Sequence, residues 1–388
     1  MKFLKQVFLL SFFISLFIYL PVQAQTSDTY FPERHNWEHK SPEDVGLNGT
    51  QIQQAINFAK ENETSNPKDL SISLNTRTNE PYNNLIGPVK ERGPMTGMII
   101  KDGYIVAEWG APHRVDMTFS VTKSFLSTTV GVAWDEGLIQ GVDEKVHKYM
   151  PVDHFNSKHN AKISWDHLLR QTSDWEGTLF GKPDWADRPQ GEITEETINR
   201  ERNEPGSKWK YNDVRVNLLA LAAINVWRQP LPVVLREHVM RPIGASNTWR
   251  WLGYENSWVN IGGIRMQSVS GGGHWGGGMW ISAYDQAKFG YLFLRNGNWD
   301  GEQIISEEWI KMARTPTDAN KGYGHMNFFL NTNNKRLPSA PESAYVFLGS
   351  GVNMVYIDQE NDLVIVARWI ANYDAMNGMI ERVIDAME

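Results

Sequence analysis

The chain has 388 residues, of which 41% are hydrophobic and 21% are charged, and its formal net charge is −7 at pH 7. This length predicts two lobes rather than one simple core. The negative balance excludes nucleic acid as an expected partner, because a polyanion would be repelled. The sequence contains no cysteine, which excludes disulfides and thiol catalysis.

The first 24 residues have the pattern of a cleaved export signal. Lys2 and Lys5 precede an apolar stretch over residues 7–20, and Val22-Gln23-Ala24 supplies small residues for a signal peptidase. The stretch is shorter than the roughly 20 apolar residues that span a bilayer. We therefore expect cleavage after Ala24 and a periplasmic or secreted protein, with no stable membrane anchor after cleavage.

The N-terminal part of the mature chain predicts one helix and one hairpin. Asn48 and Gln51 have the spacing of a helix cap, and residues 52, 55, 56 and 59 form an apolar stripe. Residues 62–95 are rich in Asn, Pro and Thr and predict a loop. Asp102-Gly103 separates two apolar β-rich runs at 98–100 and 104–106, which is a strong hairpin signal.

Strand patterns return at the C-terminal end. Residues 352–357 and 363–369 predict two strands, and a closing helix carries an apolar stripe through Ile380, Val383 and Met387. Helical and loop patterns fill the middle, including a helix after Tyr211. We expect an α+β catalytic domain over 25–388, in which a sheet lobe (about 41–118 plus 255–388) encloses a mostly helical lobe (about 119–254).

Ser120 and Lys123 form a Ser-x-x-Lys pair at the start of a long apolar segment. Residues three apart share one helix face, so the hydroxyl and the amine can meet. A serine hydroxyl needs a neighbouring base to act as a nucleophile, and a partly buried lysine can serve. The alternative is a helix-capping serine beside a solvated lysine.

The spacing alone does not select Ser120, because the sequence contains it three times. Ser65–Lys68 is interrupted by Pro67, and Ser207–Lys210 follows a polar run. Only the pair at 120 and 123 precedes an apolar helix that would bury it, as the chemistry requires. A motif match becomes specific only with such a context.

Several motifs in the same order resemble one family. Residues 119–125 (FSVTKSF) look like the nucleophile motif of the class C β-lactamase-like serine hydrolases, which include β-lactamases, DD-peptidases, carboxylesterases and 6-aminohexanoate-dimer hydrolases. Residues 167–173 (HLLRQTS) and 205–213 (PGSKWKYND) are similar to two further family segments, as are 276–285 and 299–301. The resemblance runs from about Ser41 to the C-terminus and implies a β-lactamase-like fold, an antiparallel sheet flanked by helices with an inserted helical lobe.

The resemblance also implies roles for residues. Ser120 would attack the substrate carbonyl and become acylated, while Lys123 and Tyr211 would act as general bases and acids. The backbone N–H groups of Ser120 and Ser350 would form the oxyanion hole. Without the resemblance, the preferred interpretation of Tyr211 is a half-buried aromatic residue at a helix start.

Two departures from the family pattern bear on the substrate. Phe347-Leu348-Gly349-Ser350 stands where the family carries Lys or His followed by Ser or Thr and Gly, so the cation that would hold a β-lactam carboxylate is missing. Asp213 stands where β-lactamases of this class usually carry Asn. Both changes favour a neutral ester or amide substrate, with Asp213 and Phe347 as possible substrate-binding residues.

Other features have two interpretations each. His274 lies in a glycine-rich loop, which predicts close backbone packing, and His274 could line the cleft. Trp175 belongs to a group of tryptophans that we expect to border the cleft. Their rings could form a flat platform for a decorated glycan; the alternative is that they simply fill cores. The group comprises Trp175, Trp185, Trp209, Trp275 and Trp280.

We expect no metal and no cofactor. His147, His154 and His159 lie near Asp153, but Pro151 interrupts any shared helix and the spacings match no ligand motif. The sequence therefore predicts a serine hydrolase that cleaves a small ester or amide through an acyl-enzyme on Ser120. The alternatives are a β-lactamase or DD-peptidase, and a penicillin-binding-like sensor that keeps the fold without turnover.

Overall fold

The computed structural model describes residues 29–75, 80–150 and 153–387. The predicted export signal at 1–24 lies outside the described residues. The described chain is an α+β structure with 34% helix and 21% strand. It contains antiparallel sheets with helices packed against them, which confirms the predicted fold class.

The main sheet combines strands from the N-terminal and C-terminal parts of the chain. Its strand order is β11-β12-β13-β14-β1-β2, and every neighbouring pair is antiparallel. Strand β14 pairs with β1 in a register that sets Thr96 opposite Arg368. The strands are β1 (Thr96–Lys101), β2 (Tyr104–Trp109), β11 (Phe329–Leu330), β12 (Tyr345–Gly349), β13 (Asn353–Asp358) and β14 (Leu363–Arg368).

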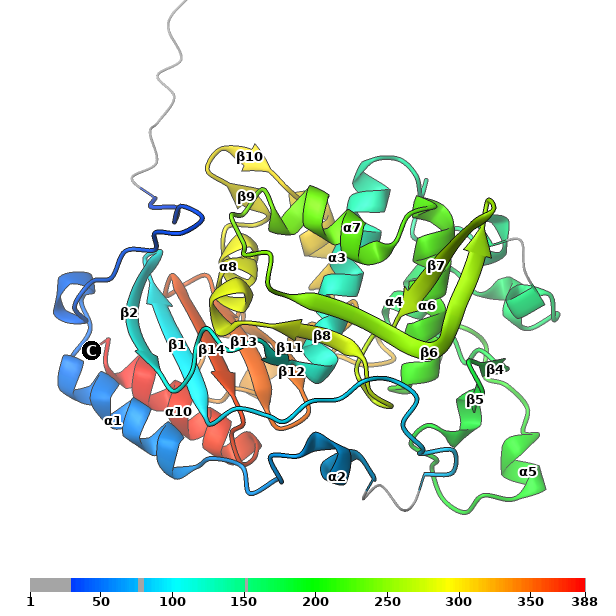
Figure 1. Cartoon of the computed structure of the whole chain (residues 1–388), viewed down its shortest axis with the longest axis horizontal. Helices are drawn as coiled ribbons and strands as arrows, with labels where there is room; N and C mark the ends of the chain where they lie inside the picture. Colours follow the sequence, from blue (N-terminus) through cyan, green and yellow to red (C-terminus); the bar gives the residue numbers. More distant parts are fainter. Residues whose placement is uncertain (1–28, 76–79, 151–152, 388) are drawn as a thin grey trace, which may run out of the picture.

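Helices cover both faces of this sheet (Figure 1). Helices α1 (Gly49–Glu61) and α10 (Tyr373–Asp385) pack together on one face, and α8 (Ala283–Leu294) lies on the other. Because side chains alternate along a strand, Phe347 of β12 joins the core beneath α8, whereas Leu348 joins the core beneath α1 and α10.

The local sequence signals for these elements are confirmed. Asp102 and Gly103 have positive φ angles of 54° and 88° and connect β1 to β2, as a tight hairpin turn requires. The Asn48 side chain accepts a hydrogen bond from the Gln51 backbone N–H at 3.1 Å and so caps α1.

A second sheet and a helical lobe complete the molecule. The second sheet has the order β3-β8-β6-β7 and includes a long hairpin that the sequence patterns did not predict. The expectation of a loop over 62–95 was wrong for residues 70–75, which form helix α2. The strands are β3 (Asp116–Met117), β6 (Arg250–Ile261), β7 (Ile264–Val269) and β8 (Gly278–Ile281).

The helical lobe is built around α3 (Thr122–Asp135) and α6 (Asp213–Trp227), whose side chains are almost all buried. Among the described residues, no single helix is long and apolar enough to cross a membrane. One pair bent by 74°, Asp213–Trp227 with Leu231–Met240, passes by length and composition alone, and most of its side chains lie in the core.

The remaining elements are short. The helices are α2 (Leu70–Asn75), α4 (Trp165–Leu169), α5 (Glu195–Ile198), α7 (Leu231–Leu235) and α9 (Glu307–Ala313), and the strands are β4 (Thr178–Leu179), β5 (Lys182–Pro183), β9 (Asn298–Trp299) and β10 (Glu302–Gln303). Single turns of 3₁₀-helix are η1 (Glu43–Val45), η2 (Phe119–Val121), η3 (Val146–Lys148), η4 (Asp153–Phe155), η5 (Asn160–Lys162), η6 (Asp184–Ala186) and η8 (Thr332–Asn334), and η7 (Arg236–Met240) is a π-helical turn.

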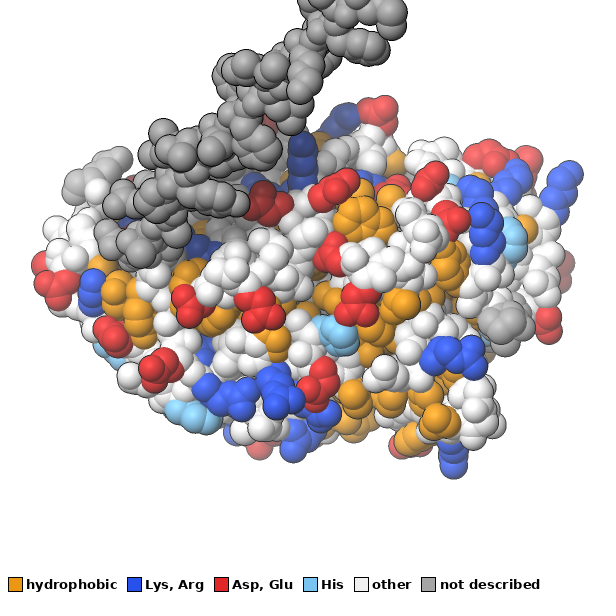
Figure 2. All heavy atoms as spheres, turned by 90° about the horizontal axis from the view of Figure 1, so that it is seen from above, with side chains coloured by type: hydrophobic (Ala, Val, Ile, Leu, Met, Phe, Trp, Pro, Cys, Tyr) orange, Lys and Arg blue, Asp and Glu red, His pale blue; other side chains and the backbone are white. Residues whose placement is uncertain are grey.

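Figure 2 shows acidic and basic side chains mixed over one face of the molecule, with apolar side chains between them.

Candidate active site

Ser120 and Lys123 lie where the second sheet meets the helical lobe. Ser120 is in the 3₁₀ turn η2, and Lys123 is in the first turn of α3. The Lys123 Nζ donates a hydrogen bond to the Ser120 Oγ at 2.9 Å. Lys123 is fully buried, whereas Ser120 is partly exposed. The spacing of three therefore brings the two side chains together, as one helix face requires.

The backbone around Ser120 is tightly constrained. Phe119 has a positive φ of 47°, which a bulky residue rarely adopts and which the surrounding packing must hold in place. Gly349, at the end of β12, leaves no room for a side chain, because a β-carbon there would lie 3.1 Å from the Ser120 N and collide with the Thr118 carbonyl oxygen. The end of β12 thus runs directly past the Ser120 backbone N–H.

Ser350 follows Gly349 at this end of β12. Its side chain is exposed, and its carbonyl accepts a hydrogen bond from the Asn353 side chain at 2.6 Å. The peptide between Gly349 and Ser350 lies beside the Ser120 N–H. An oxyanion hole needs two such backbone donors aimed at one point. The assignment of Ser350 as the second donor stays a prediction.

Tyr211 comes from the extended segment just before α6 and is partly buried. The Lys123 Nζ lies 4.8 Å from the centre of its ring. Its hydroxyl donates to the Asn327 Oδ1 at 3.5 Å. Burial raises the pKa of Tyr211 and Asp213 adds to this, while Arg188 and the nearby Ser120 hydroxyl lower it. The net shift is upward, so the resting side chain is a phenol.

Asp213 is the first residue of α6 and is buried beside Lys123. Its Oδ1 lies 2.5 Å from the Lys123 Nζ, and its Oδ2 lies 2.8 Å from the Arg188 Nη1. Burial alone would raise the pKa of this carboxyl, but Lys123, Arg188 and His274 hold it well below its ordinary value. Asp213 is therefore an anion that ties Lys123 to a larger ionic cluster.

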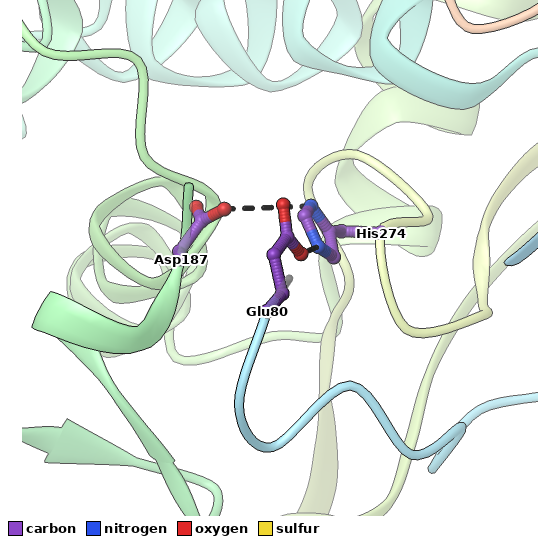
Figure 3. Close-up of side chains that lie close together, drawn as sticks. All are labelled: Glu80, Asp187 and His274. Atoms are coloured by element: carbon purple, nitrogen blue, oxygen red, sulfur yellow. Dashed lines mark hydrogen bonds and ion pairs between the residues drawn. The ribbon is translucent and has the colours of Figure 1, made fainter. Parts of the chain in front are cut away.

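His274 connects this cluster to a distant loop (Figure 3). Its Nδ1 lies 3.0 Å from the Asp213 Oδ2 and 3.6 Å from the Asp187 Oδ1, and its Nε2 lies 2.6 Å from the Glu80 Oε2. The His274 ring is almost fully buried. Both ring nitrogens therefore face carboxylates.

Glu80, Asp187 and His274 carry side chains that could ligate a metal ion, with ligand atoms within 4.8 Å of one another. Each of the three already has a partner, however: Asp187 is bound by Arg188 at 2.6 Å, and His274 bridges Glu80 to Asp213. A cation would have to displace these contacts. The arrangement fits an internal ion-pair network better than a metal centre.

The glycine-rich loop around His274 packs closely, which confirms the interpretation of its sequence. A β-carbon on Gly272 would collide with the Lys123 Nζ, so only glycine lets this backbone cover the Lys123–Asp213 pair. A cap is present at the start of α8, since the Ser282 Oγ accepts from the Asp285 N–H at 3.1 Å.

Two predicted substrate-binding residues lie in the core. Trp175 is 1% exposed, and its Nε1 donates to the His154 carbonyl at 2.7 Å. Phe347 is fully buried among the aromatic rings beneath α8, including Phe328 at 4.8 Å between ring centres. Of the other tryptophans named from the sequence, Trp275 is also buried, whereas Trp185, Trp209 and Trp280 are partly exposed.

The sequence patterns missed several members of the site. Arg188 lies two residues after η6 and Asn327 lies in the loop before β11, and both have positive φ, at 47° and 66°. Neither belongs to a recognisable motif. Glu80 comes from a segment interpreted only as a loop. Their contribution depends on long-range contacts, which no local pattern encodes.

Comparison with known proteins agrees with this geometry. The family model described as Beta-lactamase matches residues 90–381, and the chain therefore belongs to the Beta-lactamase family. Members of this fold family are serine hydrolases, among them esterases, DD-peptidases and amidases. Ser120, Lys123 and Tyr211 all lie within the matched region.

Individual relatives are distant. The putative penicillin-binding protein PbpX of Bacillus subtilis is 22% identical over 250 residues, which cover 59% of this chain and 61% of that protein. A family VIII carboxylesterase aligns with a TM-score of 0.57 at 16% identity, over 87% of this chain and 97% of the other. A putative 6-aminohexanoate-dimer hydrolase from Bacillus anthracis aligns with a TM-score of 0.53 at 15% identity, over 92% and 98%. At these identities the two structures establish the shared fold alone.

Proposed function

We propose that the protein is a serine hydrolase that cleaves an ester or amide through an acyl-enzyme on Ser120. The observation that carries this proposal is the hydrogen bond from the Lys123 Nζ to the Ser120 Oγ at 2.9 Å, with the centre of the Tyr211 ring 4.8 Å from the same Nζ. A nucleophile bonded to its base, with the base oriented by a third group, is the general pattern of such sites.

The proton path follows from these contacts. Ser120 attacks the substrate carbonyl while its proton passes to Tyr211 or Lys123 in the deprotonated form, and the negative oxygen is held by the N–H groups of Ser120 and Ser350. The group that took the proton then gives it to the leaving alcohol or amine and later activates the water that releases the acid. Because Tyr211 is a phenol at rest, it must release its own proton to solvent before it can accept the Ser120 proton.

The substrate class follows from the charges around Ser120. Lys123 and Arg188 are both paired with Asp213, so neither presents an unopposed charge to a carboxylate. The end of β12 offers apolar Phe347 and Leu348, both buried. These features favour a substrate that is neutral next to its reacting carbonyl. They disfavour β-lactams and D-alanyl peptides, which carry a carboxylate at that point.

The test is intact-mass analysis after treatment with a fluorophosphonate, for the wild type and Ser120→Ala, followed by a panel of esters, amides and nitrocefin. We expect one adduct on the wild type, none on the alanine variant, and turnover of neutral esters. Equal labelling of Ser120→Ala would show that another residue is the nucleophile. Preferential turnover of nitrocefin, or a lasting penicillin adduct, would instead support a β-lactamase or a DD-peptidase. A product burst without sustained turnover would indicate a sensor.

A decorated glycan is a possible larger substrate within this proposal. Trp185 is partly exposed, its ring meets that of Tyr82 at 5.9 Å, and it lines a cavity of about 240 Å³. Tryptophan faces suit sugar rings because they are flat and apolar. If the cavity holds a sugar, Trp185→Ala should raise KM for a sugar ester without changing the rates for an ester of a simple alcohol. Equal rates for both esters in the wild type would remove this support.

We further propose that the protein is exported and acts in the periplasm or outside the cell. The support is the signal-like pattern at 1–24. N-terminal sequencing of the protein recovered from its native host should begin at Gln25. A mature chain that still begins at Met1 would contradict export.

A further inference from the structure

Arg188 is a charged side chain beside Tyr211 that no sequence motif indicated. Its side chain is 34% exposed, so one part reaches solvent while the guanidinium remains inside the ionic cluster. The guanidinium carbon lies 5.0 Å from the centre of the Tyr211 ring. Lys123 lies 4.8 Å from the same centre. The phenol is therefore flanked by two cations.

The position of Arg188 is held at an energetic cost. Its backbone has a positive φ of 47°, which is unfavourable for a residue other than glycine. Two carboxylates hold the side chain, with Asp187 at 2.6 Å and Asp213 at 2.8 Å. A strained backbone maintained by buried partners is typical of residues that must point in one direction.

From this geometry we infer that Arg188 is a positioning residue for the proposed reaction: it holds its charge beside the Tyr211 ring and so stabilises the phenolate that accepts the Ser120 proton. This inference rests on the proposed function. Arg188 lies beside the proposed base, Tyr211. Its effect is electrostatic, because a cation near the ring favours the phenolate over the phenol before the Ser120 proton moves.

The charges around Tyr211 decide whether the loss of Arg188 favours or disfavours the phenolate. Asp213 and Asp187 both disfavour the phenolate, whereas Arg188 favours it and pairs with both carboxylates. Removing Arg188 would leave two carboxylates less opposed near the ring, and proton release would then require a higher pH. The charged or titratable groups that face Tyr211 from the elements around it are Lys123, Asp187, Arg188, Asp213 and Tyr323.

The experiment measures the rate at which a fluorophosphonate labels Ser120 as a function of pH, which requires no knowledge of the natural substrate. In the wild type, the rate should rise with pH as the base loses its proton. In Arg188→Met, the rise should move to higher pH by about one unit, the size expected for one nearby charge. Arg188→Lys keeps a cation on the same backbone and should recover part of the shift.

Arg200 offers a matched control, since its side chain is 36% exposed and is paired with Asp174 at 2.5 Å. Arg200→Met should leave the pH profile unchanged. A profile of Arg188→Met that coincides with the wild type would overturn the inference, as would an unchanged rise in Tyr211→Phe. Complete labelling at high pH shows that each variant is folded. Failure of the wild type to label at Ser120 would instead contradict the proposed function itself.

Discussion

Two Ser-x-x-Lys pairs in this molecule have the same spacing and opposite surroundings. In the first, Lys123 is buried in α3 and donates to Ser120 at 2.9 Å. In the second, Ser207 is exposed in a non-helical segment, and its Oγ donates to the Glu204 carbonyl at 2.6 Å. No hydrogen bond joins Ser207 to Lys210 among the described residues.

The difference shows what the spacing needs in order to become a site. A helix start brings the two side chains of the first pair to one face, and Asp213 compensates the buried ammonium. The second pair has neither a helix nor a carboxylate partner for its lysine. Reactivity therefore depends on the fold that surrounds the motif. Substitutions in the second pair can serve as matched controls for the same substitutions in the first pair.

The largest expected effect is the loss of the nucleophile. Ser120→Ala should lower kcat by about 10⁶-fold on any ester that the wild type hydrolyses, because no other group can form the acyl-enzyme. Ser207→Ala removes the same hydroxyl from the second pair and should leave kcat within about twofold. Steady-state assays of both variants check this. Comparable losses of kcat in the two variants would show that the two Ser-x-x-Lys pairs do not differ in their role.

The next effect is the loss of the amine. Lys123→Met keeps the length of the side chain and should lower kcat by about 10³-fold, the usual contribution of a general acid–base group. Lys210→Met should change kcat little. Single-turnover acylation rates test this directly. A larger loss in Lys210→Met would mean that the lysine beside Tyr211 in the sequence serves the reaction instead.

A third prediction concerns stability. Asp213→Asn leaves Lys123, Arg188 and His274 without their shared anion and should lower the free energy of unfolding by about 3 kcal/mol. The folded state holds the pKa of Asp213 below its unfolded value, so its stabilisation is present above about pH 4 and is lost as the pH falls further. Urea unfolding at several pH values should show the wild type and the variant converging in acid. A constant difference at all pH values would contradict this assignment.

The sheet and the central helices could be predicted because their signals are local. The Asp102-Gly103 turn, the Asn48 cap and the apolar stripe of α10 each depend on residues within one element. The long hairpin of β6 and β7 was missed. Strand β6 carries several polar side chains with irregular burial, so its pattern resembles neither a simple alternating strand nor a helix.

The site was predictable only where a motif marks it. Ser120, Lys123 and Tyr211 could be named from the sequence, and the structure brings them together. The ion pairs that organise them could not be named, because Arg188 and Glu80 reach the cluster from loops far away in the chain. Phe347 illustrates the opposite limit: it belongs to β12, which ends beside Ser120, but strand alternation turns its side chain into the core.

The smallest expected effect separates two kinds of buried lysine. Unlike Lys123, Lys182 has neutral oxygens as its hydrogen-bond partners, the carbonyls of Tyr82 and Asn84 at 2.5 and 2.7 Å and the Asn84 side chain at 3.0 Å. Burial lowers its pKa from 10.5 to about 8. Between these two values the unfolded chain binds a proton that the folded chain has lost, so folding stability should rise with pH from about 8 to 10.5. Thermal unfolding should therefore show the Tm of the wild type rising relative to the Tm of Lys182→Met across this pH window. If the two Tm values change in parallel with pH, Lys182 keeps its proton in the folded protein.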